Sequence, residues 1–329
     1  MKGSPMLPAA PLLADQLSWL HGERKVLVPM SRYTSLRVGG PADILVEPAT
    51  LEELLAVNAW ARERDVPVLW LGNGTNMVVR SGGIRGLVVS LRHVLNQLSP
   101  SAVSNWDRLR PGDQVYVRAG AGVPLTRLVH LAIQQGLVGL SFAVGIPGTI
   151  GGAIAMNAGT EMGCMWDAVV NIRLLEAEGH MLELSAADVS VGYRCAKLPA
   201  GSVALEATLR AVKGEAREVR EEIRRLYRHR LRSQPLSQPN AGSVFKNPPG
   251  ERAGRLIDQL GLKGYRLGDA QVSPTHANFI VNLGQASPDD VLALVQHIKA
   301  SVYTHMGLLL EEEINIVGES ADDPSQTIP

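Results

Sequence analysis

Three glycine-rich stretches in the first two thirds of the chain could bind a phosphate-bearing ligand. They are LGNGTNMVV (71–79), AGAGVP (119–124) and GIPGTIGGAIAMNAG (145–159). Bare backbone N–H groups in turns next to helix starts form binding sites for anions. Neutral side-chain donors accompany them at Asn73, Thr75, Asn76, Thr149 and Asn157. Each stretch alone reads as a plain turn, but the set favours a cradle for a diphosphate or an isoalloxazine ring.

The glycine-rich stretches match neither the common nucleotide-binding motifs nor a membrane helix. Neither Gly72-x-Gly74 nor Gly120-x-Gly122 continues to the third glycine of a dinucleotide fingerprint, because Met77 and Leu125 occupy that place, and there is no phosphate loop with Gly-Lys-Ser/Thr. Residues 131–160 carry no charge, but seven glycines and Pro147 would break a membrane helix there.

Three polar residues stand in segments that otherwise look buried or tightly turned. They are Arg194 in VGYRC, Ser243 in NAGSVFKNP and Glu313 in EEEINIV. Without a catalytic role, Arg194 would form a structural salt bridge, Ser243 would be a turn residue and Glu313 would belong to a solvated acidic run. Strand alternation does not choose the functional acid, because it places Glu313 in phase with Asn315, and Glu312 in phase with Ile314.

Composition excludes several classes of protein. The chain is 45% hydrophobic and 19% charged, with 32 basic and 32 acidic residues. We therefore expect a globular protein with no nucleic-acid or membrane partner. The eight histidines show no metal-ligand spacing, so no metal site is expected, and His276 reads as a hydrogen-bonded packing residue. The only cysteines, Cys164 and Cys195, fit a reducing cytoplasm.

The expected elements are mixed helices and strands without regular alternation. Thr50 opens a helix through a capping box, a second amphipathic helix covers 125–136, and residues 169–185 form a hairpin. A charged helix follows Gly214, and the proline-containing stretch 233–240 forms a hinge or loop. Ser287 caps a last helix, and a strand over 311–319 closes the chain. Residues 1–19 are expected to be flexible and 320–329 disordered.

Several motifs in a fixed order resemble the UDP-N-acetylenolpyruvoylglucosamine reductase (MurB) family. They are SLRVGGPAD (35–43), LGNGTNMVV, GIPGTIGGAIAMNAG, GYR (192–194), PNAGSVFKNP (239–248), LIDQLGLKGYRLGDAQVSPTHANFIVN (256–282) and LEEEINIVGE (310–319). The resemblance covers roughly residues 20–319. It is to the shorter of two types, because no extra insertion lies between GYR and NAGS.

The resemblance implies an α+β fold with two FAD-binding subdomains of the MurB/vanillyl-alcohol-oxidase kind, at 20–90 and 91–213. A smaller α/β substrate domain would follow at 214–319, its last strand free to return to the FAD domain. The implied enzyme is a cytoplasmic monomer with non-covalent FAD. NADPH would reduce the FAD, which then reduces UDP-N-acetylglucosamine enolpyruvate to UDP-N-acetylmuramate for peptidoglycan. The alternatives are another FAD-dependent oxidoreductase, of the alcohol or sugar oxidase type, and a non-catalytic nucleotide-sugar binding protein.

The resemblance also implies residue roles. Arg194 and Glu313 would stabilise the anionic intermediate, and Ser243 would donate the proton. The FAD contacts would be Gly39, Gly40, Gly72, Asn73, Gly74, Thr75, Asn76, Gly145, Ile146, Pro147, Gly148, Gly151, Gly152, Asn157, Ala158 and Gly159. The substrate contacts would be Tyr193, Arg230, Arg232, Lys246, Asn247 and His276. Cys195-Ala196-Lys197 departs from the family, which usually has a serine two residues after Tyr-Arg.

Overall fold

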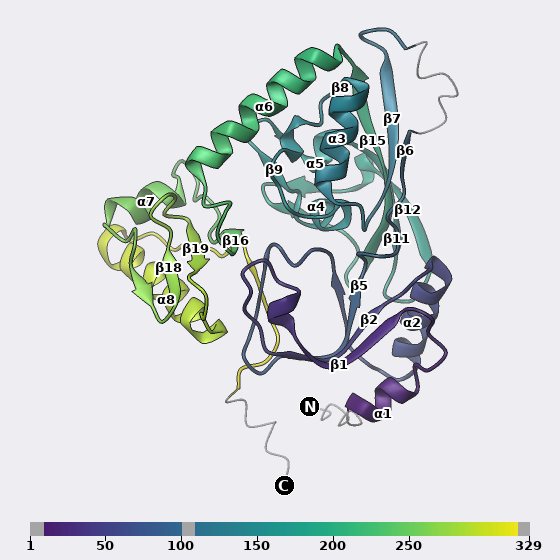
Figure 1. Cartoon of the computed structure of the whole chain (residues 1–329), viewed down its shortest axis with the longest axis horizontal. Coiled ribbons are helices and arrows are strands. Elements are labelled where there is room, and N and C mark those ends of the chain that lie inside the picture. Colours follow the sequence, from purple (N-terminus) through teal and green to yellow (C-terminus); the bar gives the residue numbers. More distant parts are fainter. Residues whose placement is uncertain (1–9, 101–108, 322–329) are drawn as a thin grey trace.

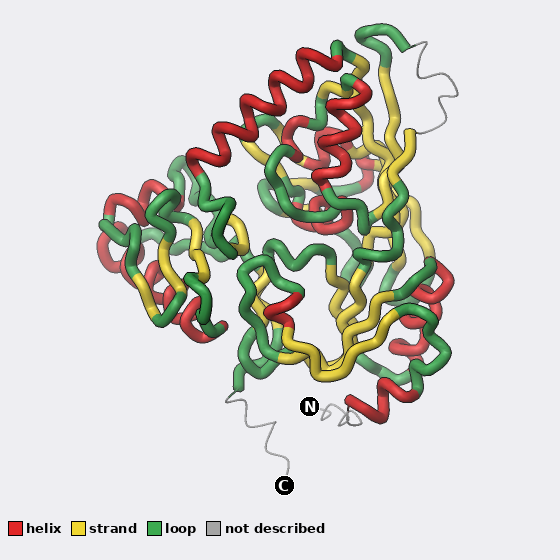
Figure 2. Tube along the Cα trace, viewed as in Figure 1, coloured by secondary structure: helices red, strands yellow, loops and turns green. Residues whose placement is uncertain are grey.

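The computed structural model describes residues 10–100 and 109–321, which form three lobes around a central space (Figure 1). The first lobe covers residues 10–90, the second 91–233 and the third 234–314. Figure 2 shows that many of the segments facing the central space are loops. The predicted α+β class is confirmed.

A four-stranded sheet forms the first lobe, in the order β1-β2-β5-β3. Its inner strands β2 and β5 read as nearly continuous apolar runs because hydrophobic clusters cover both faces. The Thr50 hydroxyl accepts a hydrogen bond from the Glu53 backbone N–H and starts α2, as predicted. The elements are α1 (Ala10–Asp15), β1 (Glu23–Pro29), β2 (Pro41–Glu47), α2 (Leu51–Glu63), β3 (Val68–Leu71), β4 (Met77–Val79) and β5 (Ile84–Ser90).

The second lobe is a six-stranded antiparallel sheet with helices on one face (Figure 1). Its order is β12-β11-β15-β7-β6, with β8 paired to the end of β15. The predicted hairpin is β11–β12. The strands are β6 (Leu98–Pro100), β7 (Gln114–Gly120), β8 (Leu137–Val138), β9 (Gly159–Thr160), β10 (Gly163–Cys164), β11 (Val169–Leu175), β12 (Met181–Ser185), β13 (Val191–Gly192), β14 (Cys195–Ala196) and β15 (Val203–Lys213). The helices are α3 (Leu125–Gln135), α4 (Ile150–Met156), α5 (Met165–Ala168) and α6 (Ala216–Ser233).

The third lobe packs α7 and α8 on a small antiparallel sheet, in the order β16-β19-β18-β17. The Ser287 hydroxyl accepts from the Asp290 N–H at 3.0 Å, which confirms the predicted cap of α8. The elements are β16 (Asn240–Ser243), α7 (Ala253–Gln259), β17 (Arg266–Leu267), β18 (Ala270–Val272), β19 (Phe279–Asn282), α8 (Pro288–Met306) and β20 (Asn315–Val317). Strand β20 leaves this lobe and pairs in parallel with β4, so the chain returns to the first lobe.

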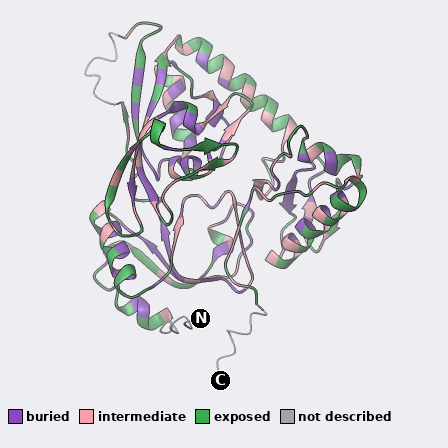
Figure 3. Cartoon of the chain, turned by 180° about the vertical axis from the view of Figure 1, so that it is seen from behind, coloured by how far each residue is buried: buried purple, intermediate pink, exposed green. Residues whose placement is uncertain are grey.

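Apolar and polar contacts fix the third lobe to the first. Leu36, Val38 and Val78 of the first lobe belong to the hydrophobic core of the third. The Ser35 hydroxyl donates to the Asn240 carbonyl at 2.6 Å. The second lobe reaches the third through α6, which stays exposed over much of its length (Figure 3).

Two predicted boundaries are wrong. Residues 10–15 form α1, and Leu13 and Leu17 are buried under the first sheet, so this part of the predicted flexible segment is ordered. Helix α6 buries Val219 and Ile223 in the core of the second lobe, so residue 214 does not begin the third lobe. Residues 1–9 and 322–329, with most of the predicted tail, lie outside the described residues. No helix among the described residues is long and apolar enough to cross a membrane.

Candidate active site

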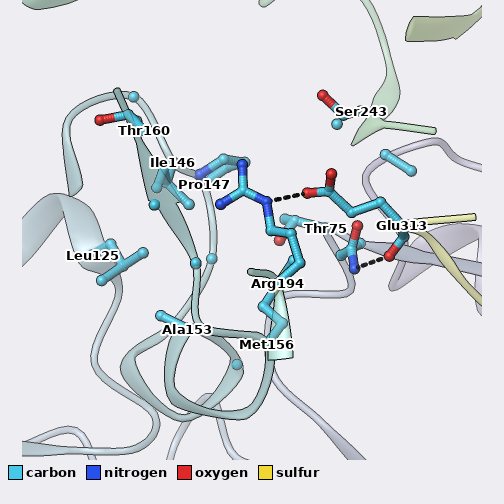
Figure 4. Close-up of a pocket in the computed structure, with 18 of the residues that line it drawn as sticks. Thr75, Leu125, Ile146, Pro147, Ala153, Met156, Thr160, Arg194, Ser243 and Glu313 are labelled. Atoms are coloured by element: carbon cyan, nitrogen blue, oxygen red, sulfur yellow. Dashed lines mark hydrogen bonds and ion pairs between the residues drawn. The ribbon is translucent and has the colours of Figure 1, made fainter. Parts of the chain in front are cut away.

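A cavity of about 1980 Å³ lies where the three lobes meet. Two of the glycine-rich stretches line it, through residues 71–77 and through residues 145–149, 152–153 and 155–159. The hairpin that carries Arg194 and the Ser243 strand also reach it (Figure 4). Segments distant in sequence therefore form one site.

The loop before α4 is held by backbone and side-chain hydrogen bonds. The Asn73 amide donates to the Pro147 carbonyl at 2.9 Å, and the Leu125 N–H donates to the Gly148 carbonyl at 3.0 Å. The Thr149 hydroxyl accepts from the Gly152 N–H and caps α4. This arrangement fixes an uncharged wall of backbone groups along the cavity.

Two glycines of this wall leave room that the protein does not use. A Cβ atom at Gly148 or Gly152 would find its nearest neighbour at 3.6 Å, and neither residue has a positive φ. Protein packing therefore does not require glycine at these positions, whereas a ligand lying on the backbone would. The cradle fits a flat ring and a diphosphate held by N–H groups, as expected for FAD.

At other predicted cofactor positions the residue is glycine because a side chain there would collide with the protein itself. Gly39, Gly40 and Gly151 do not line the cavity. A Cβ at Gly40 would lie 2.2 Å from the Ser81 carbonyl oxygen, and one at Gly151 would lie 2.9 Å from the Ala121 Cβ. The prediction that these three contact FAD is therefore not supported by their positions. The remaining predicted cofactor residues all line the cavity.

Arg194 and Glu313 meet in the cavity as an ion pair (Figure 4). The Arg194 Nε atom lies 2.7 Å from Glu313 Oε1, and the Glu313 side chain is 8% exposed. At this distance the opposite charges attract each other strongly. The two residues come from the second lobe and the returning C-terminal segment, which no sequence spacing could relate.

Backbone strain accompanies the position of Arg194. The residue occupies the turn between β13 and β14 with φ +54°, a region that glycine and asparagine prefer. Its guanidinium also lies over the Tyr193 ring, at 5.3 Å from the centroid. The Asn157 amide donates to the Gly192 carbonyl at 2.9 Å, so the end of α4 holds this hairpin. Strain of this kind persists where the surrounding structure imposes it, often at functional sites.

Each of the three glutamates in the C-terminal run forms an ion pair with a different basic side chain. Glu311 Oε2 lies 3.4 Å from Lys246 Nζ at the surface, and Glu312 Oε1 lies 2.7 Å from Lys299 Nζ. Only Glu313 of the three pairs with Arg194. The structure therefore distinguishes the three glutamates, which strand alternation in the sequence could not do.

Burial shifts the proton affinities of the charged groups here. Loss of solvent raises the pKa of Glu313, although the positive charges of Arg194 and Lys246 oppose the shift. Loss of solvent and the nearby Arg194 charge lower the pKa of Arg230. The carboxyl of Glu313 is thus easier to protonate than an ordinary glutamate.

Ser243 ends β16 beside the segment that carries Glu313. The Glu313 N–H donates to the Val244 carbonyl at 2.8 Å, and Phe245 forms a bridge with Glu312. The Asn278 side chain holds Phe245 through both its N–H and its carbonyl. Ser243 lines the cavity, and Figure 4 shows it and Glu313 extending from these neighbouring segments.

Two arginines proposed for the substrate have different positions. Arg230 is partly buried, lines the cavity and donates to the Val144 carbonyl at 2.9 Å and to Gln234. Arg232 is exposed and does not line the cavity, so its prediction as a substrate contact is not supported.

The other predicted substrate residues, Tyr193, Lys246, Asn247 and His276, all line the cavity. Asn247 also accepts from the Ala253 N–H at 3.0 Å. His276 packs edge-on against Phe279, and its Nδ1 accepts from the Asn278 N–H, which leaves Nε2 to carry the proton of the neutral ring. Burial and the charge of Lys263 lower the pKa of His276, which favours this neutral form.

Sequence reasoning missed several cavity residues. Tyr227 and Gln234 line it from the end of α6 and the residue that follows, and Glu161 and Arg252 pair across it at 3.3 Å. The helical spacing of Tyr227 and Arg230 could have suggested a shared face. Among residues 10–100 and 109–321, no group of three His, Cys, Asp or Glu side chains could hold a metal ion.

Two family models match separate parts of this chain, and similar proteins cover most of its length. Residues 42–185 match the family model described as "FAD binding domain", and residues 234–317 match "UDP-N-acetylenolpyruvoylglucosamine reductase, C-terminal domain". The reductase of that name from Moorella thermoacetica is 42% identical over 88% of this chain and 92% of its own. The one from Syntrophus aciditrophicus is 44% identical over 88% and 91%. The crystal structure of the Thermus caldophilus enzyme is 36% identical, covering 91% of this chain and 100% of its own, with a TM-score of 0.73.

Proposed function

The chain belongs to the UDP-N-acetylenolpyruvoylglucosamine reductase family, and from this premise we propose which of its residues carry the reaction. It is an FAD-dependent oxidoreductase that reduces UDP-N-acetylglucosamine enolpyruvate to UDP-N-acetylmuramate, with NADPH as reductant, in peptidoglycan synthesis. This assignment replaces the alternatives of an alcohol or sugar oxidase and of a non-catalytic binding protein.

The cradle residues hold the cofactor. The backbone around Gly72–Asn76 and Gly145–Gly148, with Gly152, supplies N–H groups and open space for FAD. The chemistry that bound FAD would supply is hydride transfer from NADPH to the enolpyruvyl carbon. The protein's own residues exclude water, position the substrate, stabilise the negative charge that develops and donate the proton.

Addition of a hydride to the enol ether leaves negative charge that spreads onto the neighbouring carboxylate. Arg194 is always charged and lies in the cavity, so it stabilises that charge. Ionised Glu313 would repel the developing anion, whereas its protonated form can donate a hydrogen bond to it. The raised pKa of Glu313 favours the form that helps. The Arg194–Glu313 pair is the observation that carries this proposal.

Ser243 supplies the proton to the adjacent carbon. Its hydroxyl lines the cavity beside the Glu313 segment, on a strand that the Asn278 side chain holds in register. Arg230 and Lys246 offer positive charge to the substrate's diphosphate or carboxylate from the same cavity. The loop after Arg194 departs from the family serine, yet Arg194 still reaches Glu313.

We further propose that the enzyme works as a monomer in the cytoplasm. All three lobes that line the cavity come from one chain, so the site needs no second copy. Both cysteines are free thiols, as a reducing compartment maintains.

The first test is the purified protein itself. We expect it to be yellow, and acid precipitation should release the flavin, because residues 71–79 and 145–159 contain no histidine or cysteine that could bind it covalently. NADPH should bleach the flavin absorbance, and UDP-N-acetylglucosamine enolpyruvate should restore it. A colourless protein that takes up no added FAD contradicts the proposal.

Ser243→Ala separates the two halves of the reaction. NADPH should bleach the variant at nearly the parent rate, since no proton from Ser243 is used there. Reoxidation by the enolpyruvyl substrate should slow roughly 10²–10⁴-fold, the usual loss for a positioned general acid. Rapid-mixing traces on protein with full FAD content measure both rates. Equal slowing of the two would mean that Ser243 only shapes the loop.

A further inference from the structure

The loop of residues 72–76 has five backbone N–H groups that the protein itself does not use. None of them donates a hydrogen bond within the described part of the chain, and all five residues line the cavity. Gly74 has φ +60°, and a left-handed residue in such a loop turns successive N–H groups toward one side. A loop of this kind binds an anion, and the anionic part of FAD is its diphosphate. Yet residues 71–79 contain no lysine, arginine or histidine that could supply a positive charge.

Arg92 places a positive charge against this loop from outside the cavity. Strands β3 and β5 are parallel and end side by side, with Leu71 paired to Ser90. The segments that follow therefore lie close together, and Arg92 Nη2 donates to the Asn73 carbonyl at 3.2 Å. Asn73 lines the cavity, whereas Arg92 does not. Within the described ranges, no other basic side chain donates a hydrogen bond to residues 72–76.

The peptide group between Asn73 and Gly74 connects Arg92 to the cavity. Among the described residues every peptide bond is trans, so a carbonyl and the N–H that follows it point in opposite directions. The Asn73 carbonyl points toward Arg92, and the Gly74 N–H therefore points away from it. Gly74 lines the cavity and its N–H has no protein acceptor there, so this donor is available to a ligand. A cation bound to the carbonyl polarises the peptide group and strengthens its N–H as a donor.

The charge of Arg92 is not neutralised by the protein. Two cations lie over the Tyr33 ring, and one of them, Lys25, has its Nζ 3.1 Å from Glu47. The Arg92 guanidinium carbon lies 5.7 Å from the ring centroid, but Arg92 forms no ion pair within the described part of the chain. Its Nε atom is buried and has no acceptor among the described residues. A charge taken out of water is costly unless it is compensated, and the Tyr33 ring and the Asn73 carbonyl offer only partial compensation.

Arg85, in the same lobe, shows what a structural arginine looks like here. Its Nη1 atom lies 2.8 Å from Asp43 Oδ1, and its Nη2 atom donates to the Gly82 carbonyl at 2.6 Å. A carboxylate of the protein therefore balances its charge. Arg92 also donates to a backbone carbonyl but has no such carboxylate, so the fold alone does not account for its charge.

We propose that Arg92 is a positioning residue of the cofactor site, whose charge supports the FAD diphosphate through the Asn73–Gly74 peptide group without touching the cofactor. This inference rests on the proposed function, which identifies the ligand as FAD. Arg92 also fixes the Asn73 backbone, while the Asn73 side chain donates to Pro147 on the facing wall of the cavity (Figure 4). One arginine outside the cavity thus supports both glycine-rich parts of the cradle.

The test compares three variants of the FAD-containing protein. Arg92→Gln removes the charge, Arg92→Lys keeps it, and Arg85→Gln is the matched control in the same lobe. Stepwise dilution gives the Kd of FAD, because released FAD is measured by its fluorescence. Phosphorus NMR of the bound FAD reports directly on the surroundings of the diphosphate. Circular dichroism checks that each variant is folded.

We expect Arg92→Gln to raise the Kd of FAD about tenfold, a moderate effect for one charge acting on a diphosphate in a partly solvated site. The phosphorus resonances of the FAD that remains bound should shift. Arg92→Lys should keep the Kd within about threefold of the parent, because the charge is retained. Arg85→Gln removes a partner of Asp43 and should lower stability, yet it should leave both the Kd and the phosphorus resonances as in the parent.

Four outcomes overturn the proposal. An unchanged Kd in Arg92→Gln would mean that the charge does not support FAD binding. An equal rise in Arg85→Gln would mean that any weakening of the first lobe releases FAD. A loss in Arg92→Lys as large as that in Arg92→Gln would show that the planar guanidinium matters and the charge does not. A raised Kd with unmoved phosphorus resonances would place the effect away from the diphosphate. A parent protein that binds no FAD would instead refute the proposed function.

Discussion

Glu311, Glu312 and Glu313 have the same chemistry and different surroundings. Their separate cations, Lys246, Lys299 and Arg194, come from three segments that are far apart in the sequence. Residue types and family motifs were enough to nominate Arg194, Ser243 and Glu313. They were not enough to show that Arg232 faces solvent while Arg230 faces the cavity, because that difference depends on the rotation of α6.

Glu313→Gln should lower turnover by about 10²–10³-fold, the usual loss when a group that stabilises transition-state charge is removed. Glu311→Gln should leave turnover unchanged. It should change the free energy of unfolding by no more than about 0.5 kcal/mol, because the Glu311 side chain is exposed. Glu312→Gln should cost about 1 kcal/mol of stability at most and leave the reaction intact. Steady-state rates and urea unfolding check the three variants. Unchanged turnover in Glu313→Gln would overturn the assignment.

The raised pKa of Glu313 has a consequence for stability. Below the ordinary carboxyl pKa of 4.5 both folded and unfolded chains hold this proton, so Glu313 contributes no pH dependence. Above it the folded chain keeps the proton longer, so the free energy of unfolding falls as the pH rises, until the raised pKa is passed. Glu313→Gln should lack this fall. Urea unfolding of both proteins between pH 4 and about 8 measures the difference, and parallel curves would mean that the pKa is not raised.

At the scale of elements, local signals predicted helix starts well. Thr50 and Ser287 cap α2 and α8 as their sequences indicated, since capping depends only on neighbours in the chain. The glycine stretches were harder to interpret, because a glycine can be required by a ligand or by another part of the protein. A Cβ at Gly148 would meet no protein atom closer than 3.6 Å, whereas a Cβ at Gly74 would lie 2.0 Å from the Tyr33 carbonyl oxygen.

Gly148→Ala tests the cradle on this basis. The new methyl group meets no protein atom closer than 3.6 Å, so the unfolding free energy of the FAD-free protein should change by less than about 1 kcal/mol. FAD affinity should fall at least tenfold, because the methyl group would enter the ligand's space. Gly74→Ala, at φ +60°, should instead destabilise the fold itself. Fluorescence titration with FAD and urea unfolding separate the effects; full FAD affinity in Gly148→Ala would remove this glycine from the cofactor site.

At the scale of the whole molecule, the family resemblance predicts two FAD-binding subdomains and a substrate domain whose last strand is free to return; in the structure β20 pairs with β4 of the first lobe. The boundary at 214 failed because α6 looks like a solvated, charged helix, while two apolar residues, Val219 and Ile223, are enough to fix it to the second lobe. No pattern in one segment could reveal that Leu36 and Val78 complete the core of the third lobe. Long-range packing of this kind depends on partners that sequence periodicity does not identify.

One cavity must receive both the reductant and the UDP-sugar. We therefore expect the two ligands to occupy overlapping space, so that high concentrations of the enolpyruvyl substrate slow the bleaching of the flavin by NADPH. Stopped-flow traces at increasing substrate concentration measure the effect. An unchanged bleaching rate at saturating substrate would mean that the two ligands bind in separate parts of the cavity.

The return of the C-terminal segment to the first lobe also determines when the enzyme can become active during its synthesis. Glu313 and β20 emerge from the ribosome after Arg194 and β4, their respective partners, because the chain is synthesised from its N-terminus. Until then β4 lacks the strand that pairs with it, and Arg194 lacks its carboxylate. A nascent chain stopped before Glu313 contains both glycine-rich parts of the cradle, yet it has no complete site in which to reduce the substrate.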